Sequence, residues 1–534
     1  MDEKKEQTLE EQLLNLIKAN ARVIQIISYE TLRVNALLVD SAKKLGRELY
    51  MWNRIEGIQK WDFSQRSFVP EDEGALAPDM PFDFFKQKDK LILLLEDFHP
   101  DLTEHGPENI KRVRNVAFSQ APDKTLILSQ PFQRLPPELE KEVHVMEIPY
   151  PNRGEITTIY KRVCFNQGIA QTRGGVPDPD NELIDAALGL TIMEAEKAFS
   201  LAYIEAGQLT KAQVPLVIRE KENVIKKTGH LEYYHAEEKI EDVGGLDVLT
   251  SWLKKRGRGF DKEAKEFGLD YPKGVMLLGV PGTGKSLTAK AIANLWHFPL
   301  LKLDMGKIFG GIVGESERNI REALNIAEAL SPSILFVDEI EKGLSGSASS
   351  GRTDGGTTSR VLGTFLSWMQ DKKKPVFVVA TANSLTLPPE LLRKGRMDEI
   401  FFVDLPTEAE REAILAIHLK KKQRDPSQFD LKKIAKASKG FSGAELEEAV
   451  KDALFQAYDG KPRPVVDEDI LEAIKKTSPL SKTMYDVIKQ SREWAQEGRA
   501  VAASSQAPET LDAGKSKQTP RLKVEAYDNP FIPE

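Results

Sequence analysis

The stretch with the clearest chemistry is a glycine-rich segment that ends in lysine and serine. Its residues are Gly279, Val280, Pro281, Gly282, Thr283, Gly284, Lys285 and Ser286, with Leu287 next in the chain. An apolar run from Val275 to Leu278 precedes the segment, and an alanine-rich, helix-forming run follows it. This order of strand, glycine loop and helix N-terminus is typical of a loop that binds phosphates through backbone N–H groups. We expect Lys285 to reach the terminal phosphates and the Ser286 hydroxyl to ligate Mg²⁺.

Two acidic residues about 50 positions further on fit the same chemistry. The segment PSILFVDEIEK (332–342) is a short apolar run that ends in Asp338 and Glu339, as expected of a buried strand beside the strand of the glycine loop. In open α/β folds ligands bind at the carboxyl edge of the sheet, where these acids would emerge. We expect Asp338 to hold the magnesium ion through water and Glu339 to orient and deprotonate the attacking water. A solvated strand end is the alternative.

Three further polar residues could act on the transferred phosphoryl group. The run PVFVVATAN (375–383) predicts a buried strand that ends in Asn383, which could hold the attacking water or sense the terminal phosphate. Arg393 and Arg396 follow in LLRKGRMD. Guanidinium groups stabilise charge on a phosphoryl group in transfer, and they can come from a neighbouring subunit. A surface cluster of ion pairs is the other interpretation of the two arginines.

The elements around these residues read as an α/β protein. Residues 8–20 have apolar positions at helical spacing after Thr8, with Glu11 as the capping-box partner. Strands are predicted at 22–30 and 48–54 with a helix near 31–46 between them, and a third apolar run, 90–100, ends in Glu96 and Asp97. This alternation of strand and helix favours a parallel sheet flanked by helices.

The sequence also contains an internal repeat. The motif LPPEL occurs at Leu135 and again at Leu387, 252 residues later. The segment 187–206 matches 437–457, with Gly189 opposite Gly440, at a separation of 251. Two matches at nearly one offset favour duplication of a whole domain, with an unrelated first α/β domain as the alternative. The first copy has IISYETLRV (26–34) where the second has its glycine loop, so we expect it not to bind a triphosphate.

Length and composition set limits on the class of protein. The 534 residues suggest two to four domains, and the net charge of −7 argues against a dedicated nucleic-acid binder. A single cysteine, Cys164, cannot form an internal disulfide, and no cysteine or histidine cluster has metal-ligand spacing. No apolar run approaches the ~18 residues that span a bilayer. We therefore expect a cytoplasmic protein, or one of the plastid stroma if it is plastid-encoded.

Together these motifs, with Val243-Gly244-Gly245, GESE (314–317) and GFSGAEL (440–446), resemble a AAA ATPase module. The resemblance implies a P-loop AAA+ fold with a helical lid, and a homo-hexameric or other ring with ATP at each subunit boundary. Arg393 and Arg396 would then act in trans. It also implies that five residues surround the adenine and ribose, namely Val243, Gly244, His418, Gly443 and Ala444. His418 could equally be an ordinary histidine of the lid core.

More closely, the segments 303–324, 363–370 and 391–414 look like the plastid and cyanobacterial hypothetical reading frame forty-six family, whose task is not settled. Threading AAA unfoldases carry an aromatic residue two positions before the glycine of GESE, and this chain has Ile312 there. That departure puts threading of a polypeptide in doubt. The glycine- and serine-rich stretch 345–359 is either a second pore loop or a surface insertion.

We therefore predict an α/β protein in which a degenerate AAA-like domain without the phosphate loop precedes a catalytic AAA module. Its function is predicted to be Mg²⁺-dependent hydrolysis of ATP by a ring that remodels an unknown protein partner. The alternative is a nucleotide-gated scaffold that does not thread polypeptide. The predicted parts are residues 1–207 (degenerate domain with lid), 208–240 (polar connector that mixes helix and linker), 241–407 (large catalytic subdomain), 408–480 (lid), 481–500 (helix) and 501–534 (disordered tail).

Overall fold

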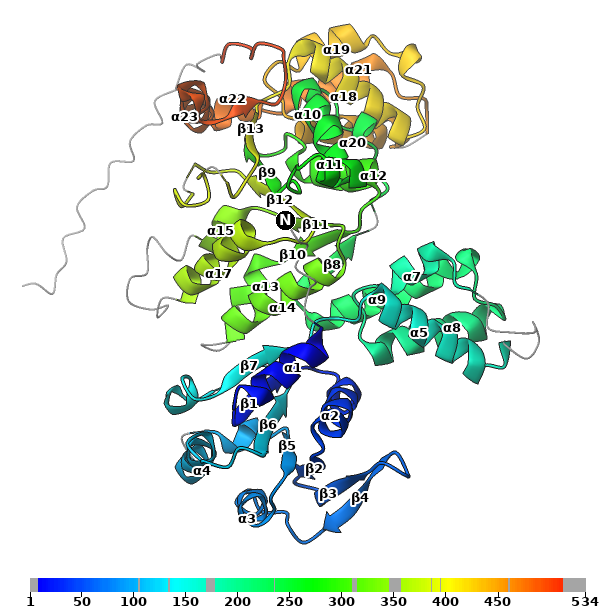
Figure 1. Ribbon diagram of the computed structural model, residues 1–534. Helices are drawn as coiled ribbons and strands as arrows, with labels where there is room; N and C mark the ends of the chain where they lie inside the picture. The colour runs from blue at the N-terminus through cyan, green and yellow to red at the C-terminus, as the bar shows by residue number, and fades with distance from the viewer. Residues whose placement is uncertain are drawn as a thin grey trace, which may run out of the picture. The chain divides into compact units, whose positions relative to one another are not determined.

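The structure is a computed structural model. It describes residues 8–103, 106–132, 135–169, 178–234, 236–309, 315–344, 357–385, 387–393, 395–459 and 462–511. The chain divides into two compact units, unit 1 (residues 1–221) and unit 2 (residues 222–534). Each unit combines a seven-stranded sheet with a group of helices (Figure 1). No helix among the described residues is long and apolar enough to cross a membrane.

The sheet of unit 1 has a parallel centre and an antiparallel edge. Its strands lie in the order β4-β3-β2-β5-β6-β1-β7, and all neighbours from β2 to β7 run parallel. The strands are β1 (Val23–Ile27), β2 (Glu48–Asn53), β3 (Gly57–Asp62), β4 (Ser67–Asp72), β5 (Leu91–Glu96), β6 (Lys124–Gln130) and β7 (His144–Glu147). The strands predicted within 22–30, 48–54 and 90–100 are confirmed. The β3–β4 hairpin was not predicted, because its side chains are mostly part-exposed and polar.

Helices cover the sheet of unit 1 and form a separate group after it. The helices around the sheet are α1 (Leu9–Lys18), α2 (Thr31–Leu45), α3 (Met80–Gln87) and α4 (Pro107–Ala117), and those after it are α5 (Arg153–Asn166), α7 (Asn181–Ala187), α8 (Ile192–Ala206) and α9 (Val214–Thr228). The boundary between the two units falls within α9, after Lys221. The predicted capping box of the first helix is confirmed, since Thr8 accepts from the Glu11 N–H and Glu11 accepts from the Thr8 N–H. Apolar faces of α1 and α2 pack on Ile24, Ile92 and Ile127 of the sheet.

The sheet of unit 2 has the order β14-β13-β9-β12-β11-β10-β8, with β8 antiparallel and the other neighbours parallel. Its strands are β8 (Leu231–Tyr234), β9 (Gly274–Gly279), β10 (Leu300–Leu303), β11 (Ser333–Val337), β12 (Val376–Ala382), β13 (Glu399–Val403) and β14 (Val501–Ala502). Every residue of β9, β11 and β12 is buried. Strands covered on both faces read as continuous apolar runs, which is why the sequence pattern located them. The prediction that the strand of Asp338 and Glu339 lies directly beside the strand of the glycine loop is wrong, because β12 lies between β9 and β11 and pairs with both.

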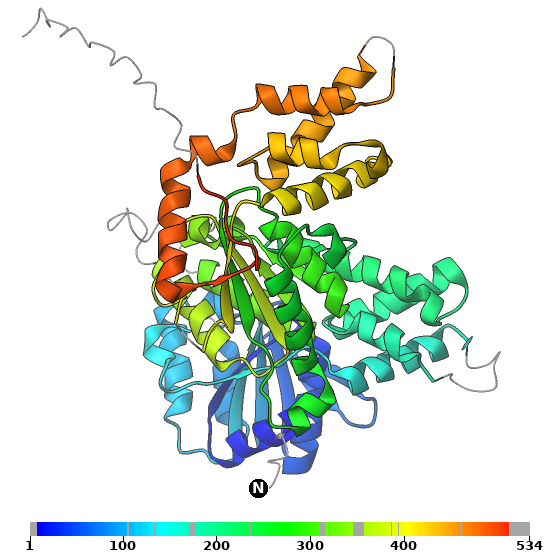
Figure 2. The same cartoon turned by 90° about the horizontal axis from the view of Figure 1, so that it is seen from above.

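Helices lie on both faces of this sheet (Figures 1 and 2). They are α10 (Asp247–Gly257), α11 (Lys262–Glu266), α12 (Lys285–Trp296), α13 (Met305–Phe309), α14 (Glu315–Ala329), α15 (Ile340–Leu344) and α17 (Thr357–Asp371). One core joins Leu249 and Leu253 of α10 and Ile292 of α12 to Val275 and Phe336 of the sheet. The lid consists of α18 (Glu408–Lys421), α19 (Leu431–Ala437), α20 (Gly443–Tyr458) and α21 (Asp467–Lys476), and α22 (Leu480–Thr483) and α23 (Tyr485–Trp494) follow it.

The topology of the two sheets supports the duplication inferred from the repeat. The order β2-β5-β6-β1-β7 in unit 1 corresponds strand for strand to β10-β11-β12-β9-β13 in unit 2, with all neighbours parallel in both. Two consecutive acids lie at the end of β5 (Glu96 and Asp97) and after β11 (Asp338 and Glu339), and the second acid of each pair has a positive φ. These residues are Asp97 (50°) and Glu339 (48°). An uncommon backbone conformation shared at one topological position argues for a common origin.

The helical groups show the same correspondence. Asn152 and Glu155 form a capping box at the start of α5, and Thr407 and Glu410 form one at the start of α18. Thr191 and Glu194 cap α8 as Ser442 and Glu445 cap α20. The duplicated segment therefore includes the lid as well as the sheet.

Two predicted segments compare differently with the structure. The connector at 208–240 contains helix, as predicted, in the 15-residue α9 with Val217 and Ile225 buried, but it also contains strand β8 of the second sheet, which was not predicted. The prediction of disorder from residue 501 is wrong for residues 501–511. Val501 and Ala502 form β14 beside Phe401 and Phe402 of β13, and the backbone hydrogen bonds hold a segment that lacks any periodic apolar pattern. Residues 512–534 lie outside the described part of the chain.

Candidate functional site

The glycine loop connects β9 to α12, as the sequence predicts. Gly282 and Gly284 have φ of 76° and 85°, a region that favours glycine. A Cβ on Gly282 would lie 2.9 Å from the Ser442 Oγ, and one on Gly279 only 2.0 Å from the Val403 carbonyl oxygen. Gly284 is the N-cap of α12, so the first N–H groups of a 12-residue helix point at the loop. The geometry is that of an anion-binding helix N-terminus.

The remaining loop residues support this conformation. The Thr283 hydroxyl donates to the Val280 carbonyl at 2.8 Å, and Leu287 packs against the core under the sheet. Pro281, between Val280 and Thr283 in the chain, is part-buried. The hydrogen bond between Thr283 and Val280 therefore helps to fix the conformation of the loop.

Lys285 is the buried cation of the site. Its side chain is 6% exposed, and its Nζ donates to the carbonyls of Gly279 at 2.9 Å and Val280 at 2.7 Å. Burial lowers the pKa of Lys285 to about 8, although Glu341, Asp338 and Glu339 act in the opposite direction. A lysine that is costly to bury and surrounded by acids is suited to pair with a phosphate.

Ser286 and Asp338 meet at the edge of the sheet. The Ser286 Oγ donates to the Asp338 Oδ1 at 2.9 Å, and the Thr381 hydroxyl donates to the same oxygen at 2.7 Å. Lys302 lies 3.3 Å from the Asp338 Oδ2. Burial acts to raise the pKa of Asp338, but the hydrogen bonds from Thr381 and Ser286 and the Lys302 charge outweigh it and lower this pKa. The carboxylate is therefore ionised at neutral pH.

This pair fits a magnesium ion. A hydroxyl and an ionised carboxylate at hydrogen-bond distance are hard oxygen donors, and Mg²⁺ is usually bound by one or two such groups together with water and substrate phosphates. Among the described residues no group of three or more histidine, cysteine or acidic side chains could hold a metal by itself. The donor set thus suits an ion that arrives with a phosphate ligand.

Glu339 and Asn383 also come together. The Asn383 Nδ2 donates to the Glu339 Oε1 at 2.9 Å, and the Asn383 N–H donates to the Glu341 Oε1 at 2.9 Å. Lys342 forms an ion pair with the other Glu339 oxygen. The Glu339 N–H donates to the Thr381 hydroxyl at 2.9 Å, which holds the acid in its positive-φ conformation. These contacts hold the Glu339 carboxylate at the carboxyl edge of the sheet.

Thr381 is the residue of the candidate site that sequence reasoning missed. Its hydroxyl donates to Asp338 and accepts from the Glu339 N–H, so it contacts both acids. The side chain is 1% exposed at the end of β12. The available signal was its position two residues before Asn383 in TAN, because alternate residues of a strand share a face.

A pocket of about 240 Å³ is lined in part by the glycine loop. Gly244, Thr283 and Gly443 all line it, which brings three of the predicted nucleotide-binding residues together. The Ala444 N–H donates to the Gly282 carbonyl at 3.0 Å, so the start of α20 lies directly against the loop. Val243 and Ala444 are not among the lining residues.

Ile414 of α18 lines this pocket, one helical turn before His418, which does not. A Cβ on Gly244 would lie 2.5 Å from the Ile414 side chain, so the glycine allows this close approach. Burial lowers the pKa of His418 despite the nearby Glu447, and three lysines act in the same direction as burial. Contact of His418 with a nucleotide stays a prediction.

The contacts of this cluster described above do not include the two arginines. Arg393 is exposed, and Arg396 is half-buried and donates to the Glu390 carbonyl. Within the described residues neither side chain forms a hydrogen bond or ion pair with the glycine loop or with the acids at the end of β11. Their action on a neighbouring subunit stays a prediction. Ile312 and residues 345–356 lie outside the described part of the chain.

In unit 1 a set of ion pairs lies at the position that the glycine loop takes in unit 2. Arg33 of α2 donates to Glu155 at 2.7 and 2.9 Å, to Glu30 at 3.2 Å, and to the Pro149 carbonyl. The Glu30 Oε1 accepts from the Ile192 N–H, at the start of α8, at 2.6 Å. A protein carboxylate thus lies at the helix N-terminus that corresponds to the start of α20. This arrangement agrees with the expectation that unit 1 does not bind a triphosphate.

The comparisons with known proteins give the class. Residues 275–405 match the family model of the ATPase family associated with various cellular activities (AAA), and 428–472 match an AAA+ lid domain. Residues 9–148 and 155–228 match the N-terminal and second domains of SpoVK-like AAA ATPases. With the fold and the phosphate loop described above, these matches define an AAA ATPase family protein with two preceding SpoVK-like domains.

Similar proteins then give the particular family. A protein named "Uncharacterized AAA domain-containing protein ycf46" from Guillardia theta is 39% identical over 498 residues, 92% of this chain and 95% of that protein. A protein of the same name from Pyropia yezoensis is 38% identical over 92% of this chain and 98% of its own length. The chain belongs to the ycf46 family. A proteasome-activating nucleotidase from Aeropyrum pernix is 38% identical over 220 residues, 40% of this chain and 52% of that protein.

Proposed function

We propose that this protein is a Mg²⁺-dependent ATP hydrolase whose single active site per chain lies in unit 2. The observation that carries the proposal is the convergence of Ser286, Asp338 and Thr381 beside the phosphate loop, with Glu339 held next to them. Ser286 and Asp338 would hold Mg²⁺, which when bound neutralises phosphate charge. Lys285 would turn from the loop carbonyls to the terminal phosphates.

The chemistry proposed for the remaining residues is general-base catalysis. Glu339 takes a proton from a water molecule while the oxygen of that water attacks the terminal phosphorus of ATP. The bond between this phosphorus and the oxygen of the departing ADP then breaks. Asn383 positions the Glu339 carboxylate through its 2.9 Å hydrogen bond. Arg393 and Arg396 of a neighbouring subunit would stabilise the charge on the transferred group.

Two variants test this proposal by different readouts. Lys285→Ala should abolish ATP binding in a calorimetric titration, because it removes the only cation buried in the loop region described here. Glu339→Gln should bind ATP as the wild type does and hydrolyse it at least about 100-fold more slowly. The matched control is Asp97→Asn, at the equivalent position in unit 1, which should change neither ATP binding nor the rate of ATP hydrolysis. Full ATP binding by Lys285→Ala would refute the assignment of the phosphate loop.

For the biological role we propose a ring that remodels a protein partner. The family relationship and the similarity to a nucleotidase named for activating the proteasome support this role. Remodelling predicts that an added client stimulates ATP hydrolysis. A nucleic-acid motor is disfavoured by the net charge of −7.

A nucleotide-gated scaffold is the second candidate, and one observation favours it. Unit 1 keeps the AAA-like fold but fills the corresponding place with the Glu30, Arg33 and Glu155 ion pairs, which suits a domain retained for binding. Such a scaffold should hydrolyse ATP slowly and retain its partner in one nucleotide state. Pull-down of partners with Glu339→Gln in ATP and in ADP separates the two roles, because a scaffold partner would not stimulate hydrolysis.

A further inference from the structure

The pocket beside the phosphate loop has a wall that is not part of the duplicated module. Six of its lining residues come from one segment after α23, and they are Ala500, Ala502, Ala503, Ser504, Gln506 and Pro508. Gly244, Thr283 and Gly443 line the same pocket. We call residues 500–509 the strap. Among the described residues of unit 1 there is no counterpart, since its duplicated segment ends before β8.

The strap is attached on one side to the large subdomain. Its strand β14 extends the sheet at β13, and the Ala503 N–H donates to the Phe402 carbonyl at 3.0 Å. The Leu249 N–H donates to the Ala503 carbonyl at 3.1 Å. Ser505 donates to Asp247 through its N–H at 2.8 Å and its hydroxyl at 2.6 Å. These contacts fix the first half of the strap to β13 and α10.

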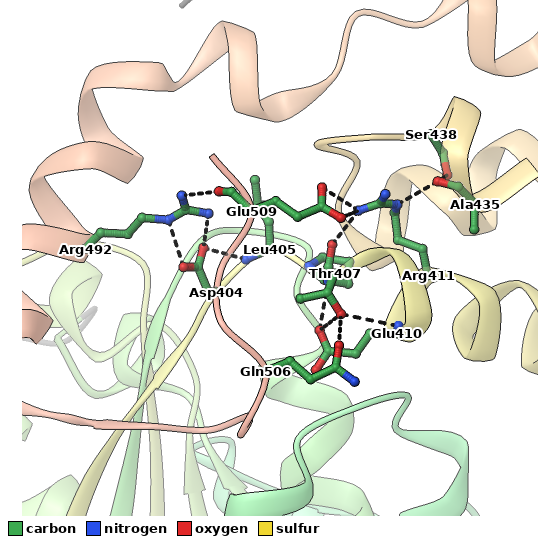
Figure 3. Close-up of polar contacts among 11 residues, drawn as sticks. Asp404, Leu405, Thr407, Glu410, Arg411, Ala435, Ser438, Arg492, Gln506 and Glu509 are labelled. Atoms are coloured by element: carbon green, nitrogen blue, oxygen red, sulfur yellow. Dashed lines mark hydrogen bonds and ion pairs between the residues drawn. The ribbon is translucent and has the colours of Figure 1, made fainter. Parts of the chain in front are cut away.

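The second half is attached to the lid, as Figure 3 shows. The Ser504 hydroxyl donates to the Glu410 Oε1 at 2.5 Å, and the Thr407 hydroxyl donates to the Gln506 Oε1 at 2.5 Å. Arg411 donates to both Glu509 oxygens at 3.1 Å. All three lid residues lie at the start of α18, where the chain leaves the large subdomain. The strap therefore bridges the two subdomains that enclose the pocket.

The contact between the strap and the lid depends on a buried arginine, Arg411. Its side chain is 1% exposed, and its other donors reach the Ala435 and Pro406 carbonyls. Within the described residues, the carboxylate that neutralises this guanidinium is that of Glu509. Counted from the aligned capping boxes, the corresponding residue of unit 1 is the buried Ile156. The copy with the phosphate loop thus carries a buried charge where the other copy has an apolar side chain, and a buried charge needs its partner.

A further arginine fixes the end of the strap to the large subdomain. Arg492 of α23 donates to the Glu509 carbonyl at 2.8 Å and to the Asp404 Oδ1 at 3.0 Å (Figure 3). Asp404 follows β13 directly and lines the pocket. The strap, the lid and the edge of the sheet are consequently joined in one hydrogen-bonded network around the pocket.

We propose that the strap forms the adenosine-side wall of the nucleotide site and couples ATP binding to the position of the lid. The inference rests on the proposed function and extends it to regulation. Apolar strap and lid side chains, such as Ala502 and Ile414, suit the face of a purine. We call the strap docked when it is attached to both the lid and the large subdomain. If ATP contacts the strap only in this docked state, ATP binding must stabilise the docked state, and docking must raise the affinity for ATP by the same factor.

The test compares ATP affinity in the full chain. Glu509→Gln should weaken ATP binding about tenfold in a calorimetric titration, because the strap loses its ionic contact with the lid. Glu472→Gln, which removes the same charge from an exposed lid pair with Lys476, is the matched control and should bind as the wild type does. Ser505→Ala, on the exposed side of the strap, should weaken binding in the same direction and keeps the test valid if Glu509→Gln folds poorly.

A double variant separates strap docking from a simple loss of fold. If the ion pair acts by holding the strap, Arg411→Ile alone should weaken ATP binding, and Arg411→Ile with Glu509→Gln should be no worse than either change. If Arg411→Ile alone is neutral and restores Glu509→Gln, the effect comes from an unpaired buried charge and the proposal is wrong. ATP should also slow hydrogen exchange of residues 501–506.

Two failures remain distinguishable. A wild-type chain that does not bind ATP overturns the proposed function. A wild-type chain that binds ATP, together with unchanged affinity in Glu509→Gln and Ser505→Ala, overturns the strap alone.

Discussion

At the scale of single residues, one hydroxyl ties both acids of the site to one strand. Thr381 donates to Asp338 at 2.7 Å and accepts from the Glu339 N–H at 2.9 Å. The first contact helps keep the Asp338 pKa low, and the second holds the backbone that carries the base. Thr381 is thus a positioning residue, since it acts through its two neighbours.

We predict that Thr381→Val lowers kcat for ATP hydrolysis by about 10- to 100-fold, the usual effect of losing a contact behind a metal ligand. The Mg²⁺ concentration needed for half-maximal rate should rise, whereas ATP affinity at saturating Mg²⁺ should change little. Thr381→Ser keeps the hydroxyl and should retain most of the activity. Ser129→Ala, at the matching position of β6, should leave hydrolysis unchanged. Equal rates for Thr381→Val and wild type would contradict the role given to this hydroxyl.

A second residue-scale prediction concerns pH and stability. Lys221 in α9 is 5% exposed, and burial lowers its pKa to about 7 although Asp185 acts in the opposite direction. In the unfolded chain the lysine keeps its proton up to its ordinary pKa of 10.5. Between these values the unfolded state binds more protons, so the free energy of unfolding rises with pH through this window.

Lys221→Met should therefore stabilise the helical part of unit 1 by about 2 kcal/mol at pH 7, with the difference shrinking as the pH approaches 10. The single cysteine, Cys164 of α5, is buried in the same helical group, so its labelling rate in urea reports opening of this part. Lys226→Met, on the exposed face of α9, is the control and should change the free energy of unfolding by less than about 0.5 kcal/mol at pH 7. A constant difference between pH 7 and pH 10 would refute the prediction.

At the scale of elements, side chains of unit 1 occupy the position that corresponds to the proposed nucleotide site of unit 2. Arg33 of α2 contacts Glu155 of α5, and Glu30 accepts from the first N–H of α8. These contacts join the sheet part to the helical part of unit 1. In unit 2 the corresponding gap between loop and lid is where we place the nucleotide, so the first copy is held closed by its own charges.

We predict that Arg33→Met costs unit 1 about 2 kcal/mol, because Glu30, which like Arg33 is only 9% exposed at its side chain, loses its cation. Labelling of Cys164 in urea is again the measurement. The control is Arg219→Met, which breaks an exposed pair with Glu205 and should cost less than about 0.5 kcal/mol. Equal labelling rates in the two variants would show that the ion pairs do not join the two parts.

At the scale of the whole molecule, the two arginines allow a test of whether chains assemble with shared sites. Within the described residues, neither Arg393 nor Arg396 contacts the phosphate loop or the acids after β11 of its own chain, and we predict that they act on the site of a neighbouring chain. A chain with Lys285→Ala has a dead site and intact arginines. A chain with Arg393→Ala and Arg396→Ala has an intact site and no arginines to offer.

Neither variant should hydrolyse ATP alone, and an equal mixture should recover roughly a quarter of wild-type activity, the fraction of boundaries that pair a good site with good arginines in a randomly mixed ring. Light scattering of Glu339→Gln should show a ring-sized particle in ATP. An inactive mixture together with a monomeric particle in ATP would contradict assembly with shared sites.

Contiguous patterns let the sequence determine much of this protein. The glycine loop and the acids after β11 were predictable because strand, loop and helix follow one another in the chain. The Thr8–Glu11 capping box needs only residues three apart, and the repeat at a separation of 251 to 252 residues is enough by itself to indicate two modules. Local spacing sets these features, and each carries its own physical signal.

Only the tertiary structure decided the rest. Thr381 gained its role from two acids 42 and 43 positions away, and the pair of Arg33 and Glu155 spans 122 residues. The strap looked like disordered chain because its two-residue strand has no periodic pattern. Its stability comes from the edge of β13 and from contacts such as Thr407 with Gln506, 99 residues apart. Contacts between residues so far apart in the chain produce no local sequence pattern, so only the folded structure shows them.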